Sequence, residues 1–128
     1  MKQPDKYAVV GNPIAHSKSP EIHRMFAQQT RQPITYEKLE APLDGFEEFA
    51  LGLREAGYRG LNVTIPFKLD AAKLADRLTP RARLAGAVNT LKFERDAITG
   101  DNTDGIGFVR DISQRLKFHI EDSAILVL

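Results

Sequence analysis

The chain of 128 residues contains no cysteine. It therefore has no disulfide, no thiolate zinc site and no cysteine nucleophile, which fits a reducing compartment. No apolar run approaches the ~20 residues that would span a bilayer. The first ten residues, MKQPDKYAVV, also lack the apolar core of a signal peptide. We expect a cytoplasmic protein with no membrane partner.

An excess of charge of one sign is missing as well. Lysine and arginine total 18 and aspartate and glutamate total 17, for a net charge of +1. A nucleic-acid interface would need clustered positive charge, so we expect no nucleic-acid partner. The histidines, His16, His23 and His119, are too scattered to suggest a metal triad, and we expect no metal site.

Strands and helices alternate along the chain, with short links and a length typical of one domain. Strands are predicted over residues 7–10, 34–39, 60–65, 87–93, 97–100 and 123–128. Helices are predicted over residues 19–29, 43–56, 69–78 and 104–116, with another short one starting at Thr79-Pro80. The pattern predicts an α/β fold: a mostly parallel open sheet with one antiparallel strand, contributed by a hairpin over 87–100, and helices on both faces.

Two helices carry apolar residues at helical spacing that we expect to face the sheet. In the first helix these are Ile22, Met25 and Phe26. In the last helix they are Ile106, Val109, Ile112 and Leu116.

Polar residues gather on or just after several of the strands. They lie at 12–19, 62–68, 89–90 and 101–104. Ligands of such sheets bind where the carboxyl ends of the strands open into loops. Because the hairpin reverses one strand, this rule alone does not bring Asn89 and Asp104 together.

Each of these residues also has an ordinary structural explanation. Ser19 before Pro20 fits a helix N-cap, and Asp104 fits the cap of the last helix. Asn62 and Thr64 fit half-exposed strand positions, and Asn89 fits a bond to local backbone. Lys68 fits less well, because a cation in the first turn of a helix opposes the helix dipole.

A lysine next to a carboxylate can perform acid–base chemistry on a small molecule. Its ammonium can donate a proton to a carbonyl oxygen, and after losing that proton it can accept one from a hydroxyl. A nearby aspartate would orient it, and the two groups would titrate as a coupled pair. Serine, threonine and asparagine can bind hydroxyls or a carboxylate without adding charge, as a polyhydroxylated acid requires.

Four motifs occur together: VVGNPIAHSKSP (9–20), GLNVTIPFK (60–68), AGAVNTL (85–91) and GDNTDG (100–105). In this order they resemble the substrate-binding domain of the shikimate/quinate dehydrogenase family. The resemblance implies an NADP-dependent shikimate dehydrogenase that reversibly reduces 3-dehydroshikimate to shikimate in aromatic amino-acid (chorismate) biosynthesis. The intact SKS triplet favours shikimate over quinate as the substrate.

The resemblance also implies a role for each site residue. The substrate site would contain Ser17, Ser19, Asn62, Thr64, Lys68, Asn89 and Asp104. Ser17 and Ser19 would hold the substrate carboxylate. Lys68 would be the catalytic acid/base, paired with Asp104, and the remaining residues would contact hydroxyls or position the lysine.

The resemblance divides the chain at residue 122. Residues 1–122 would form the substrate-binding domain, and SAILVL (123–128) would be the first strand of a truncated NADP-binding Rossmann domain. Gly105-Ile106-Gly107 matches a dinucleotide fingerprint only in part, because position 110 is arginine. Pro80 stands where some family members carry an acidic residue associated with the cofactor. The NADP pocket would therefore lie outside this chain, and the chain alone is expected to be inactive.

An apolar terminal strand with no sheet to join favours association. We expect it to pair with another chain, for example in a homodimer. Three other interpretations stay open: a stand-alone binding module for shikimate-like hydroxy acids, a quinate/shikimate dehydrogenase paralogue, and a generic doubly wound domain whose polar residues are caps and turns.

Overall fold

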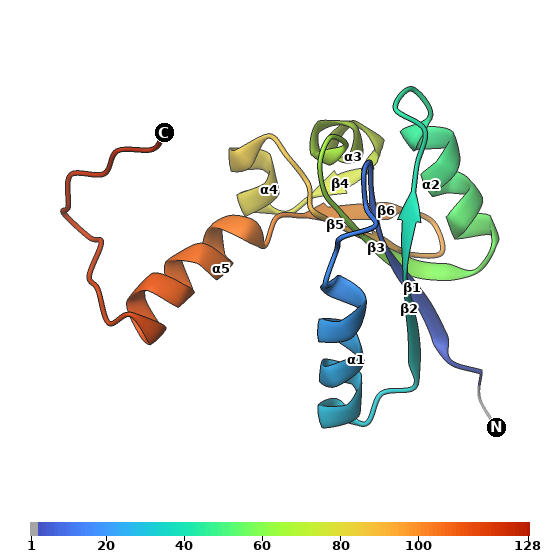
Figure 1. The fold of residues 1–128 in the computed structure, drawn as a ribbon. Helices are drawn as coiled ribbons and strands as arrows, with labels where there is room; N and C mark the ends of the chain where they lie inside the picture. Colours follow the sequence, from blue (N-terminus) through green and yellow to red (C-terminus); the bar gives the residue numbers. More distant parts are fainter. Residues whose placement is uncertain (1–2) are drawn as a thin grey trace.

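The computed structural model describes residues 3–128 and contains a six-stranded sheet flanked by helices (Figure 1). The strands are β1 (Asp5–Gly11), β2 (Ile34–Glu40), β3 (Tyr58–Val63), β4 (Arg77–Leu78), β5 (Thr90–Phe93) and β6 (Ile98–Asp101). The helices are α1 (Ser19–Thr30), α2 (Phe46–Glu55), α3 (Lys68–Leu74), α4 (Pro80–Ala85), α5 (Asp104–Arg110) and the π-helix η1 (Asp111–Arg115).

The sheet order is β2-β1-β3-β5-β6-β4. β1 pairs in parallel with β2 and β3, and β4 pairs in parallel with β6. Only β5 is reversed: it is antiparallel to both β3 and β6. The predicted fold class, a mostly parallel sheet with one antiparallel strand, is confirmed. Because β5 is reversed, its beginning lies at the sheet edge where β3 and β6 end.

The core lies between one face of the sheet and the helices α2, α3 and α4. Val10, Leu61 and Leu91 point into it from β1, β3 and β5. Phe46 from α2 and Phe67, just before α3, stack with ring centroids 5.0 Å apart. Burying each large apolar side chain contributes roughly 1.5–3 kcal/mol, so this layer fixes the helix that begins with Lys68.

The other face of the sheet is covered in part by α1. His23 of α1 stacks on Tyr36 of β2, with ring centroids 4.0 Å apart and the rings nearly parallel. The apolar residues predicted to face the sheet are instead exposed: Ile22, Met25 and Phe26. The helix contacts the sheet through the side that carries His23, and the neighbouring sheet surface stays open.

Two predicted helices have different bounds in the structure. The helix predicted over 43–56 begins only at Phe46, after a turn closed by the Gly45 N–H on the Pro42 carbonyl. The helix predicted over 69–78 ends at Leu74, and β4 follows it. Pairing of β4 with β6 overrides the local helical preference there.

The C-terminal region differs most from the prediction. α5 begins at Asp104 as expected, but the α-helix ends at Arg110 and continues as η1. These helices bury none of their residues and point away from the sheet (Figure 1). The packing predicted for Val109 and Leu116 is therefore wrong, as both are exposed.

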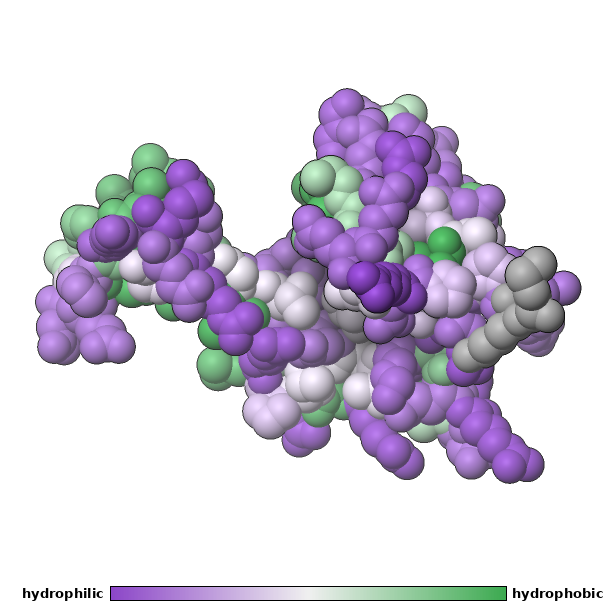
Figure 2. Space-filling model, turned by 90° about the horizontal axis from the view of Figure 1, so that it is seen from below, coloured by the Kyte–Doolittle hydropathy of each residue, from purple (hydrophilic) through white to green (hydrophobic). Residues whose placement is uncertain are grey.

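The strand predicted over residues 123–128 is also absent, and these residues are exposed. An isolated segment has no strand to pair with, so its backbone stays irregular. Figure 2 shows hydrophobic residues on the outside of the projecting part of the molecule. Within the described region, no helix is both long and apolar enough to cross a membrane.

Candidate active site

Lys68 and Asp104 form an ion pair at the sheet edge. Lys68 is the first residue of α3 and Asp104 the first residue of α5, and the Lys68 Nζ lies 2.6 Å from the Asp104 Oδ2. The two side chains are 33% and 51% exposed. An ion pair this exposed contributes at most about 1 kcal/mol to stability. Folding stability is therefore a weak reason for placing a lysine at a helix N-terminus.

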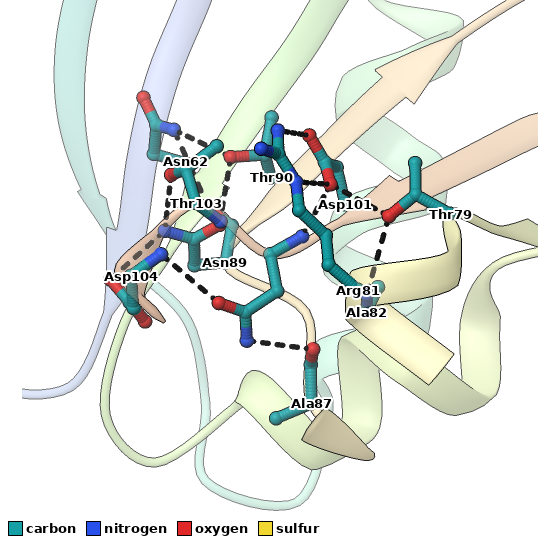
Figure 3. A network of polar contacts seen from close by, with 11 residues as sticks. Asn62, Thr79, Arg81, Ala82, Ala87, Asn89, Thr90, Asp101, Thr103 and Asp104 are labelled. Carbon is teal, nitrogen blue, oxygen red and sulfur yellow. Dashed lines mark hydrogen bonds and ion pairs between the residues drawn. The ribbon is translucent and has the colours of Figure 1, made fainter. Parts of the chain in front are cut away.

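Asn89, in the loop before β5, binds the Asp104 member of this pair (Figure 3). Its Nδ2 donates to the Asp104 Oδ1 at 3.0 Å and to the Thr103 Oγ1 at 2.8 Å. Its Oδ1 accepts from the Thr103 backbone N–H at 2.9 Å. The backbone partner of Asn89 is thus fourteen residues away and is not the local group predicted as an alternative, and the same side chain also fixes the carboxylate of Asp104.

Asn62 extends the network along the sheet. Its Nδ2 donates to the Thr90 Oγ1 at 3.2 Å, and its Oδ1 accepts from the Tyr36 hydroxyl at 2.7 Å. Thr90 in turn donates to the Asn89 Oδ1 at 3.0 Å. Burial raises the pKa of Tyr36 well above its usual range, so its hydroxyl stays protonated and remains a donor. A continuous polar path thus leads from Tyr36 to the Lys68–Asp104 pair.

The two serines lie at the Tyr36 end of this path. The Ser17 Oγ accepts from the Ser19 backbone N–H at 3.3 Å. The N-cap role predicted for Ser19 is wrong, because Ser19 is already helical and Lys18 occupies the cap position. A hydrogen bond with Ser19 lowers the pKa of Tyr36, although burial raises it more. Ser19 is therefore near the phenol, and no hydrogen bond among the described residues joins either serine to Lys68.

Thr64 and Asp104 also depart from their ordinary structural explanations. Thr64 lies just beyond β3, where its backbone N–H donates to the Val10 carbonyl at 2.9 Å. Among the described residues its side chain makes no hydrogen bond, so the structure does not join it to the network. Asp104 is not a helix cap, since Thr103 holds that position.

Three network residues were not predicted from the sequence: Tyr36, Thr90 and Thr103. Thr90 and Thr103 stand inside the AGAVNTL and GDNTDG motifs, which was an available signal. Tyr36 lies in the strand predicted over 34–39, where the local pattern gives it no polar role. A buried phenol needs a hydrogen-bond partner, and that requirement points to a polar neighbour.

A second polar cluster holds the end of β6 (Figure 3). Asp101 accepts from the Arg81 Nε at 2.7 Å and from the Thr79 Oγ1 at 2.7 Å. The Arg81 guanidinium is the main reason why the pKa of Asp101 lies well below its usual range. Thr79 also caps α4, as predicted, by accepting from the Ala82 N–H at 3.3 Å. The cluster ties α4 to the loop that leads to Asp104.

Two features that a metal or a dinucleotide would use are not found among residues 3–128. No group of three metal-ligating side chains occurs among residues 3–128. Gly105 and Gly107 lie inside α5, whereas a pyrophosphate site would need a strand-to-helix turn there. A hollow of about 790 Å³ shares Tyr36, Asn62 and Thr90 with the network but includes neither Lys68 nor Asp104.

Comparisons with known proteins agree with the motifs. A family model for the shikimate dehydrogenase substrate binding domain matches residues 9–91. A shikimate dehydrogenase (NADP(+)) from Methylobacillus flagellatus is 60% identical over 124 residues, covering 97% of this chain and 46% of the relative. One from Aromatoleum aromaticum is 57% identical, with 97% and 44% coverage.

Solved structures share the fold. The Ael1 enzyme from Pseudomonas putida has a TM-score of 0.86 and 51% identity, covering 88% of this chain and 42% of that one. Shikimate 5-dehydrogenase from Thermus thermophilus, solved with NADP(H) and shikimate, has a TM-score of 0.80 and 34% identity, covering 85% and 41%. This chain spans less than half the length of these relatives. The matched region and the shared motifs show that the chain belongs to the shikimate dehydrogenase substrate-binding domain family.

Proposed function

We propose that this chain is the substrate-binding part of an NADP-dependent shikimate dehydrogenase, which reversibly reduces 3-dehydroshikimate to shikimate. The observation that carries the proposal is the Lys68–Asp104 pair, with Asn89 bonded to the same carboxylate. The names of the relatives support the substrate and the cofactor.

The proposed role of Lys68 is to move a proton at its Nζ. In the reducing direction its ammonium donates a proton to the ketone oxygen of the substrate, and in the reverse direction its neutral amine accepts the hydroxyl proton. Asp104 compensates the lysine charge, and both of its oxygens are engaged, one by Lys68 and one by Asn89. The lysine is thus aimed by contacts that exist before substrate arrives.

The remaining site residues are proposed to bind the hydroxy acid. Ser17 and Ser19 would donate their hydroxyls to its carboxylate, and Asn62, Thr64 and Asn89 would face its ring hydroxyls. Their support is unequal. Asn62 and Asn89 belong to the network with Asp104, whereas Thr64 is placed by its motif alone.

The NADP site is proposed to lie outside residues 3–128, because Gly105 and Gly107 stand within α5 and not in a pyrophosphate loop. NADP supplies the hydride chemistry when bound, and a lysine alone cannot reduce a ketone. Residues 1–128 on their own are therefore expected to show no turnover.

The test follows NADPH absorbance with shikimate and NADP as substrates. In the complete gene product that contains this chain, Lys68→Ala should lower kcat by roughly 10²–10⁴-fold with a smaller change in KM. Lys73→Ala is the matched control, since this lysine lies on the same helix with its side chain 80% exposed. Equal activity of the two variants would reject the role of Lys68.

Residues 1–128 are assayed in parallel. Tight shikimate binding without any turnover, in a gene product that ends with this chain, would favour the stand-alone binding module. Turnover by residues 1–128 well above that of their Lys68→Ala variant would reject the proposal that the NADP site lies outside these residues.

A further inference from the structure

The segment 87–89 binds both halves of the ion pair and also the loop before Asp104. The Val88 N–H donates to the Lys68 carbonyl at 2.9 Å, which fixes the backbone of the lysine. The Asn89 amide binds the Asp104 carboxylate. The Ala87 carbonyl accepts from the Asn102 Nδ2 at 3.0 Å. The distance between lysine and carboxylate therefore depends on how this segment is tied to the loop before Asp104.

Asn102 makes that tie. It is 9% exposed and is the one buried polar or charged residue in the described region. Its Nδ2 donates to the Ala87 carbonyl, and its Oδ1 accepts from the Asp104 N–H at 3.0 Å. Its own backbone N–H donates to the Asp101 Oδ1 at 2.8 Å. One amide thus spans the two loops that carry Asn89 and Asp104.

Because α5 packs so little against the sheet, the hydrogen bonds of Asn102 are important for the position of Asp104. α5 buries none of its residues, and it points away from the sheet (Figure 1). Helix packing therefore does little to set where α5 begins. The position of Asp104 is instead set by hydrogen bonds at the helix start, to which Asn102, Asn89 and Lys68 contribute side chains.

We propose that Asn102 is a positioning residue that holds Asp104 against Lys68. Within the described residues the Asn102 side chain makes its hydrogen bonds to Asp104 and Ala87 and none to Lys68, so it acts on the lysine through Asp104 and the segment 87–89. Its importance for turnover rests on the proposed dehydrogenase function. Its role in holding Asp104 can be tested without that function.

The first measurement uses residues 1–128 and nuclear magnetic resonance. In Asn102→Ala the Asp104 backbone amide should exchange with solvent at least about tenfold faster, because a buried hydrogen bond is lost. The Asn89 side-chain amide signals should also shift, since that amide reports on the Asp104 carboxylate. Asn102→Asp keeps the acceptor for the Asp104 N–H, so exchange at Asp104 should stay closer to the wild type. Unchanged Asn89 signals and unchanged exchange in Asn102→Ala would overturn the proposal.

The second measurement uses turnover by the complete gene product. Asn102→Ala should lower kcat about 10- to 100-fold with a smaller change in KM, because a displacement near 1 Å of a catalytic group can cost that much. Asn102→Asp adds a negative charge two residues from Asp104. Because its side chain still accepts from the Asp104 N–H, kcat should nonetheless stay closer to the wild type than in Asn102→Ala.

The matched control is Asp76→Ala. Asp76 accepts from the Ile98 N–H at 2.7 Å, at the opposite end of β6. Both alanine variants should lower the melting temperature, and only Asn102→Ala should lower kcat. An equal loss of kcat in the two variants would show that Asn102 only stabilises the fold, and this result would reject the proposal. If the wild type has no turnover with shikimate and NADP, the proposed function fails, and the exchange measurement alone decides whether Asn102 holds Asp104.

Discussion

At the scale of single residues, the site depends on side-chain amides that each make hydrogen bonds to two different partners. Asn89 binds both Thr103 and Asp104, and Asn62 binds both Tyr36 and Thr90. Each amide therefore has a fixed orientation before a ligand arrives. Preorganised polar groups lose less free energy on binding than groups that must be ordered by the ligand. A substitution of one of these residues should accordingly disturb the orientation of its hydrogen-bond partner.

Tyr36→Phe tests this dependence. It removes the hydroxyl that donates to the Asn62 Oδ1 and leaves the stacking surface for His23 in place. With its orientation loosened, Asn62 should bind the substrate less well. We expect KM for shikimate to rise about threefold to tenfold, the effect of one hydrogen bond, with little change in kcat.

The control for Tyr36→Phe is Tyr7→Phe. Tyr7 lies opposite Tyr36 in the β1–β2 register, and its hydroxyl makes no hydrogen bond within residues 3–128. Steady-state kinetics of both variants checks the prediction. A similar KM in the two variants would show that Asn62 does not need the phenol.

At the scale of elements, the reversal of β5 explains why the site forms. A loop at the start of a parallel strand would lie at the far edge of the sheet. Because β5 is antiparallel, the loop that carries Asn89 meets the loops after β3 and β6. The pairing of β3 with β5 is therefore the structural requirement that can be tested by a single substitution.

Gly60→Ala should disturb that pairing. A Cβ at position 60 would lie 2.6 Å from the Leu91 carbonyl oxygen, which belongs to the backbone of β5 and cannot rotate away. We expect a loss of roughly 1–3 kcal/mol of unfolding free energy, as in other overpacked sites. Urea denaturation of residues 1–128 measures it.

Gly52→Ala is the matched control for Gly60→Ala. Gly52 lies in α2, where a Cβ would meet no atom within 4 Å. The same substitution there should stabilise the chain by up to about 1 kcal/mol, through the better helix propensity of alanine. Destabilisation of equal size at both positions would contradict the steric explanation.

The sequence predicted some elements well and others poorly, for physical reasons. The hairpin and the start of α3 follow from local signals such as the short turn at 94–96 and Pro66 before Lys68. The strand β4 was missed because its two residues are held by pairing with β6, which local pattern does not contain. Tyr36 was missed for a similar reason, since its partner Asn62 lies on another strand.

At the scale of the whole molecule, the chain is asymmetric. The core fills one face of the sheet, while α1 covers only part of the other face. α5 and the segment after it project from the body with exposed apolar side chains (Figures 1 and 2). The assignment of 1–122 and 123–128 to two domains stays a prediction. We expect another copy of the chain to cover this projecting apolar surface when residues 1–128 are studied alone.

We expect residues 1–128 to self-associate through the end of the chain. Ile125, Leu126 and Val127 are consecutive, β-branched or aliphatic, and exposed. Such a segment can gain backbone hydrogen bonds and apolar contacts by pairing with the same segment of another chain. Light scattering coupled to size-exclusion chromatography should give a mass above that of one chain, rising with concentration.

Leu126→Asp should lower the measured mass, because a charge in the paired strand must lose its hydration. Ser113→Asp, an exposed position in η1, adds the same charge outside the segment and should leave the mass unchanged. A constant monomer mass for the wild type, or equal effects of the two substitutions, would show that the terminal segment does not mediate association.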